Sequence, residues 1–468
     1  MYQSEYSKID GPSFPATTEA VQTDLYIGRR DTRRELLMSE ETPAIFTAHS
    51  EEVDCEKNVI ATYYVEGKDI PVLEAGVKIA AEESIGTWTQ VTTATEWIIK
   101  NLSAKVFEYK IEEKDTGIIK IAYPNMLFDF ETGGIPNILS IVAGNLFGIG
   151  SLQNVRLIDL QLPREAVSFF KGPKFGIDGV RKIVGTDESR RPHLGTIIKP
   201  KVGLDPRETA KVAYEAAMGG VDFIKDDETL TNQKFCPLAD RVSHVMDALD
   251  RVKAETGRTV LYSPDITTET YKIRELAQVA LDHGANALMV DFVPCGFSAV
   301  RVLAEDPSLK VPIHVHRCMH AAMTRNQKHG ISMMVLAKLV RLAGGDQLHT
   351  GTVAGKMGGR EKKVEELISI NSFLKGNFFG LKSTFPVASG GVHPTLVPIN
   401  VHTLGKDIVI QAGGGIHGHP EGTRAGATAM RQAIDAVTNG ISLEEYAKTH
   451  RELATAIKHW SMKFTPDE

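Results

Sequence analysis

The feature that most constrains the fold is a regular alternation in the second half of the chain. From His193 onward, short apolar runs alternate with amphipathic segments of about 10–18 residues that have helical periodicity. Such βα repetition builds a parallel sheet, since each helix returns the chain to the start of the next strand. Eight runs predict a closed (β/α)8 TIM barrel, with a doubly wound open sheet as the alternative. The predicted strands are Leu194–Ile198, Asp222–Lys225, Val260–Tyr262, Ala287–Asp291, Ile313–His316, Gln347–His349, Pro386–Ser389 and Ile408–Gln411, and a final helical stretch is Leu443–His459.

The length of the chain requires more than the barrel. At 468 residues it exceeds a single hydrophobic core, which stops growing at roughly 250–300 residues. Residues 54–170 combine strand-like and helix-like segments, which predicts a smaller α+β domain of ferredoxin-like type. The strand-like runs include Val59–Val65, Val106–Ile111 and Ile118–Tyr123, and the helix-like segments include Val72–Glu83 and Ile138–Leu146. Residues 1–53 are charged and turn-rich and are predicted to be an N-terminal extension, either a loose terminus or a subunit contact. The barrel domain, with its C-terminal helices, is assigned to 171–468.

Composition excludes several partner classes. A formal net charge of −6 and a pI near 6.2 predict no general attraction to nucleic acid or anionic membranes, so any anionic ligand must be held locally. No run reaches the roughly 18 apolar residues of a membrane helix, and the first residues lack the apolar core of a secretory signal, so a cytoplasmic location is expected. The four cysteines are far apart and form no CxxC pair, which favours free thiols over disulfides or a structural zinc site.

Polar residues gather where the predicted strands end. In a (β/α)8 barrel the chemistry lies at the carboxyl ends of the strands, and six of the eight predicted strands end in residues that do not belong in an apolar core. These residues are Lys199 and Lys201, then Lys225, Asp227 and Glu228, then His316 and Arg317, then His349, then Ser389, Gly390 and Gly391, and finally Gly413, Gly414 and Gly415.

The lysines and acids at the first two strand ends suggest proton transfer and metal binding. Lys199 and Lys201 are two residues apart, so on a strand both amines face one site and lower each other's pKa; two solvated lysines are the alternative. Asp227 and Glu228 offer the carboxylate oxygens that Mg²⁺ prefers. The neutral amine of Lys225 can react with CO2 to form a carbamate, a third oxygen ligand. An ordinary surface ion-pair cluster is the alternative for this group.

Glycine-rich stretches near the end of the barrel suggest phosphate binding. The glycines at 390–391 and 413–415 follow the last two predicted strands, where backbone N–H groups of barrels often bind phosphate; plain turns are the alternative. The segment Thr350–Arg360 is also rich in glycine and contains Lys356. It is typical of a lid that closes a cation over a ligand, although a simple flexible loop has the same composition.

At these residues the chain resembles the ribulose-bisphosphate carboxylase/oxygenase large-chain family, from about Asn58 to Trp460. Phrases such as GPKFGIDGVRKIVG (Gly172–Gly185) and DQLHTGTVAGKMGG (Asp346–Gly359) are most similar to the archaeal type, often called form III. The shared motifs are AAEESIGTW (Ala80–Trp88), AGNLFG (Ala143–Gly148), GTIIKPKVGL (Gly195–Leu204), GGVDFIKDDE (Gly219–Glu228), HVHRCMHAA (His314–Ala322), HTGTVAGKMGG (His349–Gly359), PVASGG (Pro386–Gly391) and QAGGGIHGHP (Gln411–Pro420).

The resemblance implies Mg²⁺-dependent enolisation of ribulose 1,5-bisphosphate and addition of CO2 or O2, carboxylation giving two 3-phosphoglycerate, and the archaeal type implies a role in nucleoside monophosphate salvage. It implies that an activating CO2 carbamylates Lys225, which binds the metal together with Asp227 and Glu228. It makes Lys199 the acid/base lysine, assisted by Lys201 and His316. It also implies a homodimer, in which the N-terminal domain of one subunit caps the barrel of the other.

The same resemblance assigns the substrate contacts. One phosphate is held by Arg317, His349 and Ser389. The other is held by Thr87, Trp88, Lys356, Gly390, Gly391, Gly413 and Gly414, and Lys356 also stabilises the carboxylated product. Glu82 and Asn145 complete the set, and together with Thr87 and Trp88 they are expected to serve the neighbouring subunit's site.

Three other functions compete with this interpretation. A carboxylase-like enolase or isomerase of sulfur salvage has the same fold, but such relatives usually lose several of the residues named above. A zinc hydrolase with a carboxylated lysine is suggested by the pair His314 and His316, although there the HxH pair precedes the lysine, and here it follows Lys225. A sugar-phosphate-binding protein without turnover would not need the acid/base lysines.

Overall fold

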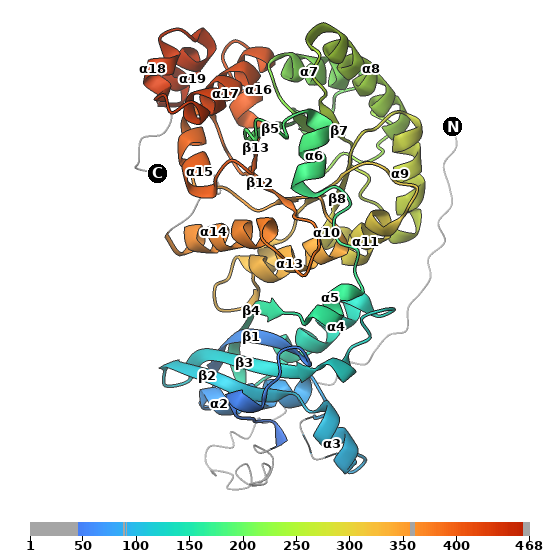
Figure 1. Ribbon diagram of the computed structural model, residues 1–468, viewed down its shortest axis with the longest axis vertical. Helices are drawn as coiled ribbons and strands as arrows, with labels where there is room; N and C mark the ends of the chain where they lie inside the picture. The colour runs from blue at the N-terminus through green and yellow to red at the C-terminus, as the bar shows by residue number, and fades with distance from the viewer. Residues whose placement is uncertain (1–44, 88, 90, 356–360, 462–468) are drawn as a thin grey trace, which may run out of the picture. The chain divides into compact units, whose positions relative to one another are not determined.

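The computed structural model describes residues 45–87, 89, 91–355 and 361–461 (Figure 1). It contains two sheets, one of five strands and one of eight. Most of the predicted extension lies outside the described residues. At its end, Phe46 is buried and its carbonyl oxygen accepts a hydrogen bond from Val106 N at 2.8 Å. The domain boundaries proposed from the sequence stay a prediction.

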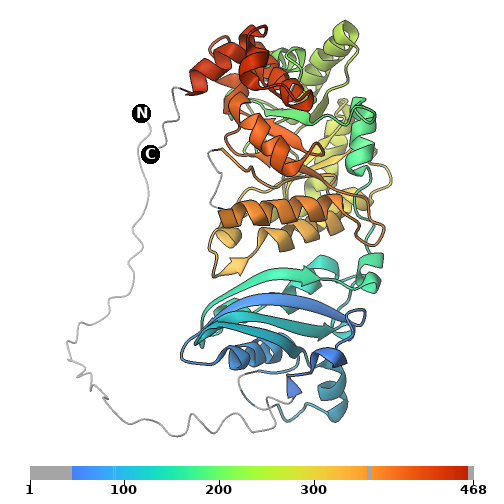
Figure 2. The ribbon, with the colours of Figure 1, turned by 60° about the vertical axis from the view of Figure 1, so that its left-hand side comes forward.

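The N-terminal domain is built on the smaller sheet. Its strands are β1 (Asn58–Gly67), β2 (Lys105–Glu113), β3 (Thr116–Pro124) and β4 (Leu152–Gln161), and β1 pairs antiparallel with both β3 and β4. Burial alternates along β3, where Ile119 and Ile121 point inward, and helix α2 (Val72–Glu82) contacts β1, β2 and β3 on one face of the sheet (Figure 2). This confirms the predicted smaller α+β domain.

The chain of the second domain adds the fifth strand to that sheet. Strand β10 (Gly330–Ile331) pairs parallel with β4 at Arg156 and Leu157, which gives the order β10-β4-β1-β3-β2. The remaining helices of the N-terminal domain are α3 (Glu96–Leu102), α4 (Gly134–Val142) and α5 (Arg164–Ser168). Strand β4 and helix α3 are absent from the predicted elements.

The eight-stranded sheet is parallel throughout and has the order β7-β6-β5-β13-β12-β11-β9-β8. Its outer strands also meet, because Met289 N donates to the carbonyl oxygen of Pro264 at 2.9 Å and Ile266 N donates to that of Met289 at 3.1 Å. The sheet is therefore a closed barrel, and the doubly wound alternative is wrong. The strands are β5 (His193–Ile197), β6 (Phe223–Lys225), β7 (Leu261–Ser263), β8 (Leu288–Asp291), β9 (Ile313–His316), β11 (Gln347–His349), β12 (Phe385–Ser389) and β13 (Val409–Ala412).

Helices surround the barrel, as Figure 1 shows. Asp205 caps α7: its carboxylate accepts hydrogen bonds from the backbone N–H groups of Arg207 and Glu208 and so satisfies two donors of the first turn. The predicted stretch Leu443–His459 forms two helices rather than one. The helices are α6 (Gly176–Val184), α7 (Pro206–Met218), α8 (Leu238–Thr256), α9 (Ile273–Asp282), α10 (Phe292–Cys295), α11 (Phe297–Glu305), α12 (Ala321–Thr324), α13 (Met333–Ala343), α14 (Glu361–Lys375), α15 (Val397–Leu404), α16 (Gly414–His417), α17 (Thr423–Thr438), α18 (Leu443–Ala447) and α19 (Arg451–Ser461).

The two ends of the barrel differ in chemistry. Near the amino ends of the strands, the apolar side chains of Phe223, Leu261 and Phe385 pack against Ile177 and Val180 of α6. The polar residues singled out from the sequence lie at the carboxyl ends, and the amino ends carry other buried polar groups, among them His193 and Asp222. Among the described helices, none is long and apolar enough to span a membrane.

Candidate active site

The carboxyl ends of β5 and β6 bring three lysines and two carboxylates together. Lys199 Nζ donates to Asp227 Oδ2 at 2.6 Å. Lys201 Nζ lies 3.9 Å from Asp227 Oδ1 and 3.8 Å from Glu228 Oε1, and Lys225 Nζ lies 3.7 Å from Glu228 Oε2. The side chains of Asp227 and Lys225 are 0% and 1% exposed, whereas that of Lys201 is 58% exposed. The five predicted residues therefore form one cluster.

Only two of the three consecutive acids after Lys225 belong to this cluster. The Asp226 carboxylate accepts hydrogen bonds from Arg241 Nε at 3.0 Å and from the Tyr262 hydroxyl at 2.7 Å, and its side chain is fully buried. It ties the end of β6 to α8 and β7 and so positions the two acids that follow. No role was predicted for Asp226 from the sequence. Side-chain alternation along the strand could have separated it from Asp227, because consecutive residues of a strand face opposite sides.

The charge state of Glu228 follows from its surroundings. Burial on its own would raise the pKa of this carboxyl, but its surroundings, first among them the positive charge of Lys225, outweigh burial and lower the pKa to about 2. Glu228 is therefore an anion at neutral pH. The cluster carries negative charge that cations stabilise.

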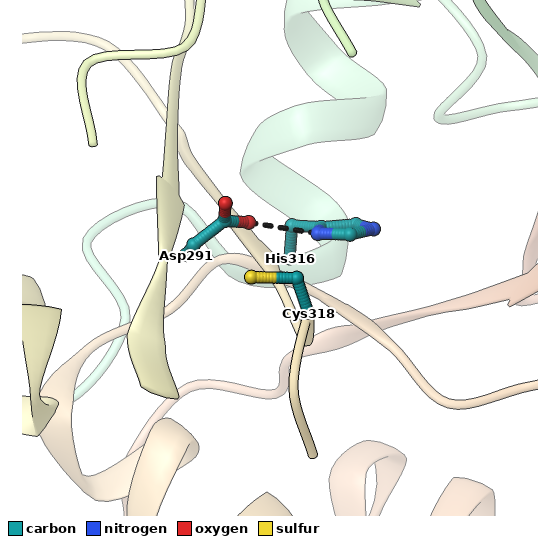
Figure 3. A group of neighbouring side chains, drawn as sticks. All are labelled: Asp291, His316 and Cys318. Atoms are coloured by element: carbon teal, nitrogen blue, oxygen red, sulfur yellow. Dashed lines mark hydrogen bonds and ion pairs between the residues drawn. The ribbon is translucent and has the colours of Figure 1, made fainter. Parts of the chain in front are cut away.

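His316, at the end of β9, is held by a residue that sequence reasoning missed. Asp291 ends β8 and is the register partner of His316, so both side chains face the barrel interior. His316 Nδ1 lies 2.7 Å from Asp291 Oδ1 (Figure 3). The other ring nitrogen, Nε2, lies 3.8 Å from Glu228 Oε2. Because a carboxylate accepts, Nδ1 carries the proton and Nε2 faces Glu228. Asp291 could have been found from the sequence, because it is the polar residue that ends the fourth predicted strand, Ala287–Asp291.

A buried hydrogen-bond chain links β9, β11 and β12. His314 Nδ1 donates to Gln347 Oε1 at 2.8 Å, and His314 Nε2 lies 2.8 Å from His349 Nε2. His349 Nδ1 lies 2.7 Å from Ser389 Oγ. Burial lowers the pKa values of His314 and His349 well below the usual range, so both rings are neutral. The rings of His316 and His349 meet edge to face with centroids 4.6 Å apart. His314 and Gln347 thus support the predicted residues His349 and Ser389.

Arg317 is a partly buried cation that the negative charge of Glu366 acts on without a direct contact. Its guanidinium forms no hydrogen bond or ion pair with a described residue, and it lies beside Gly351, where an added Cβ would be 2.8 Å from Arg317 Nη2. Burial lowers the pKa of Arg317 to about 10, so it stays positively charged at neutral pH. Such a group is suited to an anionic ligand.

The predicted glycines border the same end of the barrel. Gly390 and Gly391 have φ angles of 120° and 84°, a backbone conformation that glycine adopts without strain. Gly413 lies beside Lys199, since a Cβ added to it would be 3.2 Å from Lys199 Cε. Gly414 begins α16 directly afterwards.

The predicted residues of the N-terminal domain form a separate group. Asn145 Nδ2 donates to Glu82 Oε1 at 3.4 Å, and Thr87 is exposed. Among the described residues, no hydrogen bond or ion pair joins Glu82, Thr87 or Asn145 to the barrel cluster. Trp88 and Lys356 lie outside the described residues.

Two family models match the chain and together span most of it. The model described as ribulose bisphosphate carboxylase large chain, N-terminal domain, matches residues 48–166. The model described as ribulose bisphosphate carboxylase large chain, catalytic domain, matches residues 176–460.

Individual proteins are similar over nearly the same range. The ribulose bisphosphate carboxylase of Methanocaldococcus jannaschii is 48% identical over 420 residues, which covers 86% of this chain and 97% of that protein. The octameric ribulose-1,5-bisphosphate carboxylase/oxygenase of Pyrococcus horikoshii matches with a TM-score of 0.84 and 42% identity, covering 90% and 98% of the two chains. The dimeric archaeal Rubisco of Hyperthermus butylicus matches with a TM-score of 0.80 and 38% identity, covering 90% and 99%.

Proposed function

The chain belongs to the ribulose bisphosphate carboxylase large-chain family, and from this premise we propose that it is a lyase that adds CO2 to ribulose 1,5-bisphosphate. Carboxylation yields two 3-phosphoglycerate, and O2 is the competing co-substrate. The observation that carries the proposal is the convergence of Lys199, Lys225, Asp227, Glu228 and His316 at one end of the barrel. We also propose a role in nucleoside monophosphate salvage, which the resemblance of the sequence to the archaeal type implies.

Asp227 and Glu228 are our proposed ligands for Mg²⁺. Carboxylate oxygens are the donors this ion prefers. In this structure three lysine amines balance the negative charge of the two carboxylates, and a bound Mg²⁺ would take over that role. A third anionic oxygen comes from Lys225: its neutral amine attacks CO2, a C–N bond forms, and one proton is released as the carbamate appears. When bound there, Mg²⁺ would act as a Lewis acid that polarises the oxygens of the sugar.

The proton transfers of enolisation and of the final carbanion are assigned to Lys199. Its amine already reaches the carboxylate that would bind the metal, at 2.6 Å from Asp227 Oδ2. Lys201 Nζ lies 3.8 Å from Glu228 Oε1, and His316 Nε2 lies 3.8 Å from Glu228 Oε2. Both groups can relay protons at this position. The bond from Asp291 holds the His316 ring in the orientation that this role needs.

The two phosphates are proposed to bind on either side of the cluster. The guanidinium of Arg317, which forms no hydrogen bond with a described residue, supports one phosphate position, next to His349 and Ser389. The positive φ angles of Gly390 and Gly391 support a second position at which backbone N–H groups approach an anion. We assign to this second position Gly390, Gly391, Gly413, Gly414, Thr87, Trp88 and Lys356.

The active assembly is proposed to be a homodimer or an oligomer of dimers. Related structures are dimeric and octameric, and Glu82 and Asn145 contact each other rather than the barrel cluster in the described part of this chain. A partner subunit would bring these residues, with Thr87, to the barrel that lacks them.

One assay tests the proposed function. The purified protein is incubated with Mg²⁺ and labelled bicarbonate, then with ribulose 1,5-bisphosphate, and labelled 3-phosphoglycerate is measured. We expect turnover that rises after pre-incubation with CO2 and Mg²⁺, and we expect Lys225→Arg to abolish both turnover and the activation lag, because arginine cannot form the carbamate. The matched control is Lys211→Arg on the exposed face of α7. Full activity in Lys225→Arg contradicts the metal site, and absence of labelled product from the wild type favours the enolase or isomerase alternative.

A further inference from the structure

A second group of metal-binding side chains lies next to the proposed active site. Asp291, His316 and Cys318 each offer one ligand atom, and these three atoms lie within 4.8 Å of one another (Figure 3). Asp291 and His316 end the neighbouring strands β8 and β9 in register, and Cys318 follows two residues after His316. Two paired strands and the start of one loop therefore position the group.

The three side chains are close enough to share an ion, and His316 can offer Nδ1 to it while Nε2 stays directed at Glu228. His316 is the only described residue that forms an ion pair with Asp291, with Nδ1 and Oδ1 2.7 Å apart. The side chains of Asp291 and His316 are 2% and 14% exposed, so the group is shielded but reachable. Burial, and then the negative charge of Asp291, raises the pKa of the Cys318 thiol to about 12, so the thiol is protonated at neutral pH. A bound cation would displace the thiol proton of Cys318 to solvent. At His316 it would bind Nδ1, and the ring proton would move to Nε2 so that the imidazole stays neutral.

The donor set selects a different class of ion from the neighbouring carboxylates. One thiolate sulfur, one imidazole nitrogen and one carboxylate oxygen are typical ligands of tetrahedral Zn²⁺. Mg²⁺ instead requires an octahedral set of oxygen ligands. The carboxylates of Asp227 and Glu228 match this requirement better than a set that contains sulfur and nitrogen. In a zinc tetrahedron neighbouring donor atoms are roughly 3.3–3.8 Å apart, so shifts of about 1 Å or less in the side chains suffice.

We propose that Asp291, His316 and Cys318 form an inhibitory binding site for a thiophilic divalent cation of the Zn²⁺ class, distinct from the Mg²⁺ site. The binding part stands on the geometry alone, and the inhibitory part rests on the proposed function. A cation on His316 Nδ1 separates the ring from Asp291, which positions it. It also brings two positive charges next to Glu228, which lies 3.8 Å from His316 Nε2, and so opposes Mg²⁺ binding there.

Binding is tested with Co²⁺ and Zn²⁺ on the full-length protein. Co²⁺ should produce a sulfur-to-cobalt charge-transfer band and the visible spectrum of tetrahedral cobalt, and Zn²⁺ should displace it while a large excess of Mg²⁺ should not. In Cys318→Ser the charge-transfer band should vanish and Zn²⁺ affinity should fall at least about tenfold. The matched control is Cys295→Ser, which removes another partly buried thiol, bonded to the carbonyl oxygen of Thr268, and should keep both signals.

A measurement on the wild type alone covers the case in which a variant does not fold. An X-ray absorption spectrum at the zinc edge should show one sulfur together with nitrogen or oxygen ligands. A spectrum without sulfur, or a cobalt band that persists in Cys318→Ser, overturns the site.

Inhibition is scored separately from binding. In the bicarbonate assay, Zn²⁺ should inhibit the wild type and Cys295→Ser at a concentration at least about tenfold lower than it inhibits Cys318→Ser. Equal inhibition of all three overturns the inhibitory role. Zinc bound through sulfur by a protein that makes no 3-phosphoglycerate would uphold the site while contradicting the proposed function, and turnover without sulfur-bound zinc would do the reverse.

Discussion

At the scale of single residues, His193 at the amino end of β5 should leave a signature in acid stability. The ring is fully buried and lies 2.6 Å from Thr186 Oγ1, and burial lowers the pKa of His193 to about 3. In the unfolded chain the ring takes a proton below about pH 6.5, whereas in the folded chain it stays neutral. The folded state therefore loses up to about 1.4 kcal/mol per pH unit as the pH falls from about 6.5 toward 3.

We expect the Tm of His193→Gln to fall less steeply between pH 7 and pH 5 than that of the wild type, because glutamine does not titrate. Scanning fluorimetry over a pH series measures this slope. The control is His283→Gln, an exposed histidine whose replacement should leave the slope unchanged. Parallel slopes for the wild type and His193→Gln would contradict the assignment.

Also at this scale, the pair Asp226–Arg241 should matter far more than a surface pair of similar geometry. Both side chains are fully buried and their Oδ2 and Nε atoms are 3.0 Å apart. Asp226→Ala leaves Arg241 charged and unpaired, which should destabilise the fold by about 3–5 kcal/mol. Glu215→Ala breaks the exposed pair with Arg424 and should cost about 0–1 kcal/mol. Denaturant unfolding compares the two variants, and similar losses would contradict this account.

At the scale of elements, the contact between β5 and β13 depends on Gly195. A Cβ at this position would lie 1.9 Å from Gln411 Oε1 and 3.2 Å from Phe223, inside the closed barrel. Gly195→Ala should therefore destabilise the protein by about 1–3 kcal/mol through overpacking. The polar side-chain atoms of Gln411 have no hydrogen-bond partner among the described residues, so truncating this side chain removes the clash without breaking a bond.

A double-mutant cycle tests that contact. Gly195→Ala combined with Gln411→Ala should be more stable than the sum of the single variants by at least about 0.5 kcal/mol, since the two residues touch. Additive losses, measured by denaturant unfolding, would show that β5 and β13 adjust without this specific contact.

At the scale of the whole molecule, the proposed active site should need two chains. Glu82 and Asn145 contact each other, and within the described residues neither bonds to the barrel cluster. Mixing inactive Glu82→Gln with inactive Lys199→Ala should restore part of the activity, because a heterodimer assembles one site with both native residues. Carboxylation in the mixture measures the rescue, and native mass spectrometry verifies subunit exchange. Exchange without any rescue would argue that each chain completes its own site.

The predicted barrel strands were located to within one residue of the observed ones, and Ile313–His316 and Gln347–His349 coincide with β9 and β11. Buried parallel strands are short and apolar, and the helices between them are amphipathic, so the signal is local. Strand β4 escaped prediction because it carries Arg156, which is 4% exposed and donates to the carbonyl oxygen of Thr324 at 3.1 Å. From the sequence alone, an arginine is read as a surface residue, because the distant residues that accept its hydrogen bonds in the interior are not apparent.

The helix predicted at Ile138–Leu146 shows the same limit. Helix α4 spans Gly134–Val142, and beyond it Gly144 N donates to the Glu83 carboxylate at 2.9 Å. Glu83 is buried in the interior of the domain, and this burial raises its pKa to about 6. A contact with a residue far away in the sequence ends the helix, and helical periodicity cannot reveal it.

The sequence by itself determined the barrel, the smaller α+β domain and the set of charged residues at the strand ends, since alternation and strand order depend on neighbours along the chain. Only the tertiary structure decided that Asp226 turns away to Arg241 while Asp227 joins the lysines, and that Asp291 holds His316. It also decided that Glu82 and Asn145 form a group apart from the barrel cluster. Strand register and the packing of distant segments set these contacts, and neither can be predicted from local periodicity.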